Sequence, residues 1–238
     1  MVCWSSLAAI SVIVPAFNAA RYLPEAVASI HEQTCAPLEI IVIDDGSTDE
    51  TPEVVRALGN AVVSIRQSNL GIGAARNRGV EAARGNYLAF LDADDLFMPG
   101  KLARQLAHLR GEGGPDISFG CVEEFVDSDP SRDQASSLVA RVGARGGGVP
   151  GAMLISRADF LRVGVFDVSW RVGEFADWYM RAMDAGLRAE TLDEVVLRRR
   201  LHGDNVGIRE RASRADFARI MKRALDRRKQ AAAGSETP

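Results

Sequence analysis

Three aspartates follow a short apolar run in the stretch NYLAFLDADDLFMP, which spans residues 86–99. Like charges this close raise one another's pKa values and cost stability unless a cation compensates them. Asp92 and Asp94 are separated by one residue, so both carboxylates can project to the same side of an extended turn. Mg²⁺ and Mn²⁺ are commonly held by one or two carboxylates together with phosphate oxygens. The stretch favours a divalent cation site, with an acidic turn that caps the next helix as the alternative.

A second acidic pair, Asp44 and Asp45, opens the stretch DDGSTDET. Ionised carboxylates only accept hydrogen bonds, which suits the N–H of a nucleotide base and the hydroxyls of a ribose. In the alternative interpretation, the stretch is a loop in which Ser47 or Asp49 caps the next helix. The residue types alone do not choose between the two.

Cationic side chains and one histidine are candidates for the same site. Arg76 and Arg78 lie in the first turns of a helix expected in GIGAARNRGVEAARG, where they could pair with phosphates. For Arg78, an ordinary surface position is the favoured interpretation. His202 follows an arginine-rich run, and a neutral imidazole can ligate Mn²⁺. A structural role at the end of a strand is the alternative for His202.

Familiar nucleotide-binding motifs are missing. Gly71 and Gly73 match the start of a dinucleotide fingerprint, but Arg76 stands where its third glycine belongs. No GxxxxGK[ST] motif is present, which excludes a Walker-type NTPase. Nucleotidyl transfer usually needs a glycine-rich segment with a basic residue after the first strand, and VPAFNAARY does not supply one.

The elements that would position these residues alternate in the manner of a βαβ protein. β-branched runs predict buried parallel strands at residues 9–15, 38–44, 61–67 and 87–92. Helical spacing and helix-start signals predict helices at residues 19–33, after residue 47, and at residues 71–85. This order gives a three-layer α/β unit with a ligand crevice at the carboxyl ends of the strands. Both acidic pairs follow strands, so we expect them on one edge of the sheet.

The second half has weaker patterns. Strands are expected at residues 151–156 and 194–202, helices at residues 158–163 and 173–188, and a mobile loop at residues 127–148. A basic helix is expected at residues 209–229, followed by a disordered tail. We expect residues 1–110 to form the nucleotide-binding half and residues 111–208 the acceptor and catalytic half of the same domain. Residues 209–238 then form the helix and tail.

Composition and charge narrow the function classes. Apolar residues make up 47% and charged residues 26% of the 238 residues, as in ordinary soluble globular proteins. The three cysteines form no CxxC pair, so we expect no zinc site or disulfide framework and a cytoplasmic location. Neither a signal peptide nor a membrane span is expected.

The net charge of −3 is unevenly distributed. Residues 198–229 hold 12 basic and 4 acidic residues. No nucleic-acid motif accompanies them, so a nucleic-acid partner is not expected. The apolar stripe on the basic helix at residues 209–229 could lie peripherally on the inner face of an anionic membrane. Packing of this stripe against the domain is the favoured interpretation.

Four segments together resemble the family 2 glycosyltransferases, which have a GT-A fold: SVIVPAFNAARYLPEAVASI, EIIVIDDGSTDET, QSNLGIGAARNRGVEAARGNYLAFLDADD and FLRVGVFD. The resemblance is continuous from Ile10 to about Lys101 and patchier to His202. It implies an inverting transferase that moves a sugar from a nucleotide diphosphate donor, most often a UDP-sugar, with Mn²⁺ or Mg²⁺. The implied fold is a Rossmann-like, mainly parallel sheet with a smaller acceptor-side part.

The resemblance also implies site residues. The turn with Pro15, Phe17 and Asn18, together with Asp44 and Asp45, would line the base and ribose pocket. Arg76 would approach the donor. Asp92 and Asp94 would form the DxD pair that binds the metal, and Asp92 would also contact the donor. His202 would be a further metal ligand.

The catalytic base is where the sequence departs from the family. The family usually places it in a Glu-Asp pair that opens a helix, but Phe175 stands at the aspartate position. Glu174 and Asp177 are one helical turn apart, so both carboxylates could lie on one face. We expect Asp177 to be the general base, with Glu174 as the second candidate. In the alternative interpretation, both are ordinary acids at the start of a helix, where the helix macrodipole favours negative charge.

Two functions stay open from the sequence. The first is a metal-dependent glycosyltransferase, whose acceptor could be a glycan, a lipid-linked molecule or a peptide natural product. The second is a nucleotide-sugar-binding protein that has lost catalysis and acts as a sensor or partner subunit.

Overall fold

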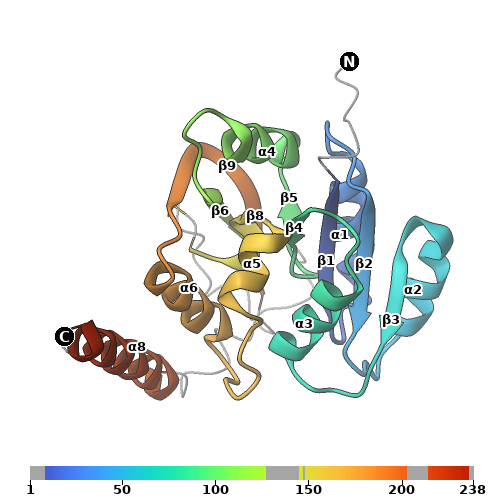
Figure 1. Ribbon diagram of the computed structural model, residues 1–238. Helices are drawn as coiled ribbons and strands as arrows, with labels where there is room; N and C mark the ends of the chain where they lie inside the picture. The colour runs from blue at the N-terminus through green and yellow to red at the C-terminus, as the bar shows by residue number, and fades with distance from the viewer. Residues whose placement is uncertain (1–8, 127–144, 147, 203–213, 236–238) are drawn as a thin grey trace.

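One continuous sheet runs through the chain. The computed structural model describes residues 9–126, 145–146, 148–202 and 214–235. Within these residues the sheet has nine strands in the order β3-β2-β1-β4-β8-β6-β9-β5, with β7 paired to β6 (Figure 1). The strands are β1 Ile10–Ala16, β2 Glu39–Asp44, β3 Val63–Arg66, β4 Tyr87–Phe90, β5 Leu96–Phe97, β6 Ile117–Val126, β7 Arg145–Gly146, β8 Leu154–Ser156 and β9 Ala189–Leu201.

The first half of the sheet is parallel. β1 pairs in parallel with β2 and β4, and β2 pairs in parallel with β3. Every residue of β1 and β2 is buried. Continuous β-branched runs suit this position because helices cover both faces of a parallel sheet. The four strands expected here and the α/β fold class are confirmed.

Helices cover the two faces of the sheet. They are α1 Leu23–His31, α2 Thr51–Leu58, α3 Ile72–Ala82, α4 Lys101–Arg110, α5 Arg157–Val163, α6 Glu174–Asp184 and α8 Arg214–Ser235. The strand order advances from β1 to β3 and then returns to β4, so right-handed crossovers place α3 on the face opposite α1 and α2. α3 packs very close to β1, since a Cβ on Gly79 would lie 2.4 Å from Ile13 Cγ2.

The second half extends the same sheet. β8 pairs antiparallel with β4, β6 pairs antiparallel with β8, and β6 and β9 pair in parallel. An aromatic cluster lies beneath this part, in which Phe160 and Trp178 stack with centroids 4.9 Å apart. Met153 and Trp178 are fully buried.

Some elements differ from expectation. β5 and β6 were not expected, and β9 begins five residues earlier than the strand predicted at residues 194–202. α8 reaches Ser235 and thus extends into the segment expected to be a disordered tail. The loop expected at residues 127–148 lies mostly outside the described residues. No helix in the described part of the chain is long and apolar enough to cross a membrane.

Candidate active site

The acidic pairs lie on one edge of the sheet. Ala16 at the end of β1 pairs with Asp44 at the end of β2, and Ile13 pairs with Phe90 at the end of β4. All three strands run in the same direction, so the residues that follow them emerge at the same edge. The expectation that Asp44-Asp45 and Asp92/Asp94 share an edge is confirmed.

The loops after β1 and β2 hold each other in place. The backbone N–H of Asn18 donates to Ser47 Oγ at 2.9 Å, and Asn18 Oδ1 accepts from the N–H of Thr48 at 2.8 Å. Asn18 has a left-handed backbone with φ of 50°, a conformation that asparagine tolerates better than most residues. The neighbouring Phe17 leaves 49% of its surface exposed, whereas Pro15 is buried in β1.

Asp44 and Asp45 have different surroundings. Asp44 Oδ1 accepts from the N–H of Ser47 at 2.9 Å, while its Oδ2 is buried without a hydrogen bond. The nearest cation to that oxygen is Arg66, whose Nε lies 3.4 Å away. Asp45 accepts from the N–H groups of Leu70 and Gly71 at 2.9 and 2.8 Å. Asp45 therefore holds the loop before α3 in place. The Oδ2 atom of Asp44 has no hydrogen bond and could still accept one.

Arg76 is the centre of the charged cluster. Its guanidinium is 2% exposed, and it donates to Asp92 Oδ1 at 2.5 Å and to Glu174 Oε1. Burial by itself would lower the pKa of Arg76, but the charges and hydrogen bonds of the two carboxylates raise that pKa overall. α3, the turn after β4 and the first residue of α6 meet at this one side chain.

Asp94 lies beside His202. Asp94 Oδ2 is 2.9 Å from His202 Nε2, although the two residues are far apart in sequence. The ring of His202 also lies against Tyr22, with centroids 4.9 Å apart. The structure thus brings the expected ligand pair together.

Asp95, the third aspartate of the stretch, is buried. Its Oδ1 accepts from the N–H of Arg200 at 2.9 Å. Burial and the nearby charges of Asp94 and Asp92 raise the pKa of this carboxyl. The stretch does not cap the following helix, since α4 begins after Gly100 without a side-chain cap.

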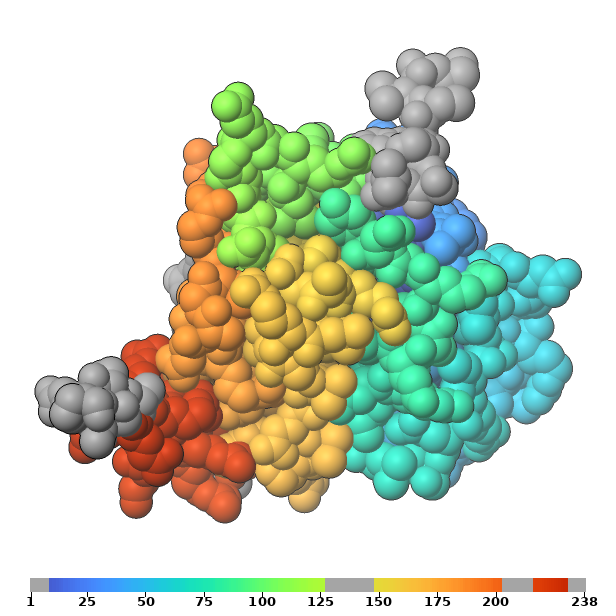
Figure 2. Space-filling model, viewed as in Figure 1, coloured from blue at the N-terminus to red at the C-terminus, as the bar shows by residue number. Residues whose placement is uncertain are grey.

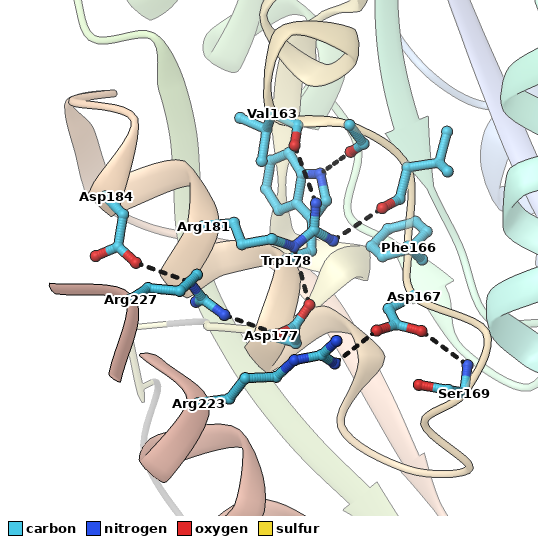
Figure 3. Close-up of polar contacts among 12 residues, drawn as sticks. Val163, Phe166, Asp167, Ser169, Asp177, Trp178, Arg181, Asp184, Arg223 and Arg227 are labelled. Carbon is cyan, nitrogen blue, oxygen red and sulfur yellow. Dashed lines mark hydrogen bonds and ion pairs between the residues drawn. The ribbon is translucent and has the colours of Figure 1, made fainter. Parts of the chain in front are cut away.

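The structure separates Asp177 from this cluster. Asp177 Oδ2 accepts from Arg181 Nε at 2.9 Å, and its Oδ1 lies 3.6 Å from Arg227 of α8 (Figure 3). Among the described residues, Glu174 and Asp177 have no ion-pair partner in common. Asp177 is therefore paired with cations of α6 and α8, whereas Glu174 is paired with Arg76.

Phe175 belongs to the core. Its ring stacks on Trp178 and Tyr179 at 6.1 and 6.2 Å, and it meets Phe119 edge-on. Since only 7% of its surface is exposed, the side chain supports α6 from below. A carboxylate is therefore missing from the position where the family usually has one.

Arg200 belongs to the arginine run at residues 198–200, in which we expect some but not all side chains to reach the diphosphate, because alternate residues of a strand face opposite sides. Arg200 is buried, its Nε donates to the carbonyl of Asp94 at 2.9 Å, and its guanidinium pairs with Glu25 at 2.5 Å. The structure shows this alternation, because Arg198 and Arg200 both lie against the ring of Phe125 whereas Arg199 pairs with Glu124. Arg78 pairs with Glu81 on the surface, as expected.

The Asp and His side chains of this site supply some of the ligands that a hard or borderline cation would need. Within the described ranges no three His, Cys, Asp or Glu side chains are grouped as a metal site. Asp94 and His202 nevertheless place an oxygen and a nitrogen 2.9 Å apart. Mg²⁺ or Mn²⁺ bound with substrate phosphates needs only one or two protein ligands. The pair is compatible with such an ion, and Asp92 is engaged by Arg76.

Comparisons with known proteins agree on one family. A family model described as Glycosyl transferase family 2 matches residues 11–158. An uncharacterized glycosyltransferase of Nostoc is 34% identical over 215 residues, which cover 82% of this chain and 66% of that protein. A PGL/p-HBAD biosynthesis glycosyltransferase of Mycobacterium tuberculosis is 33% identical over 173 residues, which cover 71% of this chain and 66% of that protein.

The chain spans a smaller share of another relative. An uncharacterized glycosyltransferase of Rickettsia prowazekii is 35% identical over 118 residues, which are 50% of this chain but 37% of that protein. Among solved structures, residues 1–349 of Staphylococcus aureus TarS in complex with UDP-GlcNAc give a TM-score of 0.73 at 21% identity. The match covers 91% of this chain and 65% of that chain. At this identity the likeness establishes the fold.

Proposed function

The chain belongs to glycosyl transferase family 2, and we propose that it transfers a sugar from a nucleotide diphosphate donor to a hydroxyl acceptor. The observation that carries this proposal is the cluster around Arg76. This buried guanidinium joins Asp92, on the donor edge of the sheet, to Glu174, at the start of α6. Donor and acceptor chemistry would therefore meet at one side chain.

Donor binding would use the edge formed by the loops after β1 and β2. The buried Oδ2 of Asp44 would accept the base N–H, because it is the oxygen without a hydrogen bond. Phe17 is exposed beside this loop and can cover the base. The TarS complexes with UDP and UDP-GlcNAc make UDP-sugars the first donors to test.

Asp94 and His202 would hold Mn²⁺ or Mg²⁺, and such an ion, when bound, neutralises charge on a departing diphosphate. Arg200 would position Asp94, since it holds the backbone carbonyl of that residue. Replacing Asp94 with Asn should weaken Mn²⁺-dependent UDP binding at least about tenfold by calorimetry. Asp193→Asn is the matched control, because Asp193 is exposed on β9. If Asp94→Asn bound UDP with unchanged Mn²⁺-dependent affinity, Asp94 would not be a metal ligand.

Glu174 is our proposed general base. It lies in the Arg76 cluster, whereas Asp177 is paired with Arg181 and Arg227 on the side of α8. This assignment reverses the order expected from the sequence. The base would take the proton of the acceptor hydroxyl as that oxygen attacks the anomeric carbon.

Two variants separate the candidate bases. Glu174→Gln keeps an acceptor for Arg76 and should lower transfer about a hundredfold or more while donor affinity is retained. Asp177→Asn should leave the transfer rate within about threefold and act mainly on stability. Transfer, or donor hydrolysis where no acceptor is known, would be measured as release of UDP. A larger loss in Asp177→Asn than in Glu174→Gln, at equal stability, would return the role to Asp177.

A second function is favoured by one observation. Phe175 is buried at the family's base position, and both remaining carboxylates are ion-paired. A chain of this kind could bind nucleotide sugars without turning them over and act as a sensor or partner subunit. Measurable UDP-sugar binding without release of UDP from any donor in a broad panel would favour this function over transfer.

A further inference from the structure

One face of α8 is committed to the protein. Ile220 is fully buried and Ala224 is nearly so, and the helix packs against α6. A Cβ on Gly173, just before α6, would lie 2.8 Å from Ile220 Cδ1. Arg223 pairs with Asp167 at 2.8 Å, and Arg227 and Arg228 pair with Asp184. This face confirms the expectation that the helix packs on the domain.

A second face of α8 is apolar and exposed. Phe217, Met221 and Leu225 follow one another at intervals of four residues and leave 45%, 49% and 51% of their surfaces exposed. Side chains at this spacing lie along one stripe of a helix. Figure 2 shows α8 at one end of the molecule. We call these three side chains the α8 stripe.

Basic residues border the α8 stripe. At about 100° per residue, Lys222 and Lys229 lie beside Leu225 on the side of the helix away from Ile220. Both lysines are exposed, and neither has an ion pair with the described residues. Arg228 is 58% exposed, but it is paired with Asp184 at 2.7 Å, so its charge is compensated. The exposed part of α8 therefore combines an apolar line with the charges of Lys222 and Lys229, and exposed Asp226 lies one turn after Lys222.

We propose that the α8 stripe docks peripherally on an anionic lipid bilayer. An amphipathic helix with apolar side chains on one face and lysines beside them lies in the interface plane, where the lysines meet anionic headgroups. A second copy of the chain fits less well. A two-fold contact through the stripe would bring Lys222 and Lys229 of both copies together, and like charges at such distances repel.

The test is cosedimentation of the full chain with lipid vesicles. We expect binding to phosphatidylcholine vesicles with roughly one third phosphatidylglycerol, little binding to pure phosphatidylcholine, and weakening by salt. Met221→Gln with Leu225→Gln should lower the binding constant at least about tenfold. Lys222→Gln with Lys229→Gln should lower it by a smaller factor and reduce its dependence on salt. None of these side chains belongs to the buried face of α8.

A matched control separates docking from general stickiness. Leu38 and Val63 are exposed to a similar degree, 51% and 40%, on the first half of the molecule. Leu38→Gln with Val63→Gln should leave vesicle binding unchanged. The proposal is overturned if the wild type does not bind the anionic vesicles at low salt, or if the control and the stripe variants lose binding equally. A concentration-dependent dimer that the stripe variants abolish, without vesicle binding, would assign the stripe to a second copy.

Discussion

At the scale of single residues, Arg76 is the side chain on which most of the site depends. Replacing it with Met would leave the buried Glu174 carboxylate without its cation. Breaking a buried ion pair by removing one partner costs about 3 kcal/mol or more. We therefore expect Arg76→Met to lower the free energy of unfolding by about this amount in urea titrations.

Arg78 provides the control for Arg76. It lies on the same helix and also pairs with a glutamate, but its side chain is 48% exposed and that of Glu81 is 70% exposed. Exposed pairs contribute little because solvent screens them, so Arg78→Met should stay within about 0.5 kcal/mol of the wild type. Equal losses in the two variants would contradict a special role for the buried pair.

Lys101 should make stability depend on pH. It is fully buried in α4, and burial lowers the pKa of its ammonium from 10.5 to about 7. Between these two values the unfolded chain binds more protons than the folded one, so the free energy of unfolding rises with pH. Relative to Lys101→Met, the wild type should gain on the order of 3 kcal/mol between about pH 7 and pH 10.

The measurement for Lys101 is urea unfolding of both proteins at a series of pH values. Comparison with the methionine variant removes the contributions of other groups that titrate above neutral pH. A difference between the two proteins that is constant across this window would mean that the lysine does not titrate there.

Sequence reasoning found some residues of the site because of where they stand in the chain. Asp44, Asp45, Asp92 and Asp94 directly follow buried strands, so the strand pattern alone puts them on one edge. The different ion pairs of Glu174 and Asp177 could not all be predicted in that way. Arg181 lies four residues after Asp177 on the same helix, but Arg227 is a remote residue whose position follows from how α8 packs on α6.

At the scale of elements, the contact between α8 and the start of α6 can be tested at two glycines. Gly173 and Gly186 flank α6 and both have left-handed backbones, with φ of 92° and 79°. Only Gly173 lies against Ile220, since a Cβ on Gly186 would meet nothing within 4 Å. Gly173→Ala should therefore destabilise the fold by about 1–3 kcal/mol more than Gly186→Ala.

Both Gly173→Ala and Gly186→Ala strain a left-handed backbone, so the difference between their stabilities reports the contact with Ile220. Thermal unfolding would report the difference, and adding Ile220→Ala to Gly173→Ala should recover part of it by making room. Equal losses at the two glycines, with no recovery, would show that α8 does not press on the start of α6.

Elements differed in how well the sequence predicted them. The strands of the parallel half are short apolar runs buried on both faces, so their composition defines them. β5 has two residues, and β6 has an irregular register near Gly120, where a Cβ would lie 2.3 Å from Val196 Cγ1. Such strands are stabilised by their neighbours, and local periodicity does not show them.

At the scale of the whole molecule, the continuous sheet should make the two halves unfold together. β8 joins β4 of the first half to β6 of the second. A variant with Trp4→Phe, Cys3→Ser and Cys121→Ser leaves Trp170 and Trp178 as reporters of the second half and buried Cys35 as a reporter of the first. Tryptophan fluorescence and pulse labelling of the thiol should give the same urea midpoint.

Separate midpoints for the two reporters would instead show two independently stable units. The first half alone could then be studied as a fragment. Far-UV circular dichroism, which reports on both halves at once, would provide the reference curve for either outcome.

The bonds that Asp45 makes to Leu70 and Gly71 also affect how fast a donor could be captured. Because these hydrogen bonds lie within the chain, the conformational entropy of this segment would be lost during folding and not during ligand capture. Association would then proceed without waiting for a closure step on this side of the crevice. Any slow rearrangement that limits turnover would have to arise elsewhere on the rim.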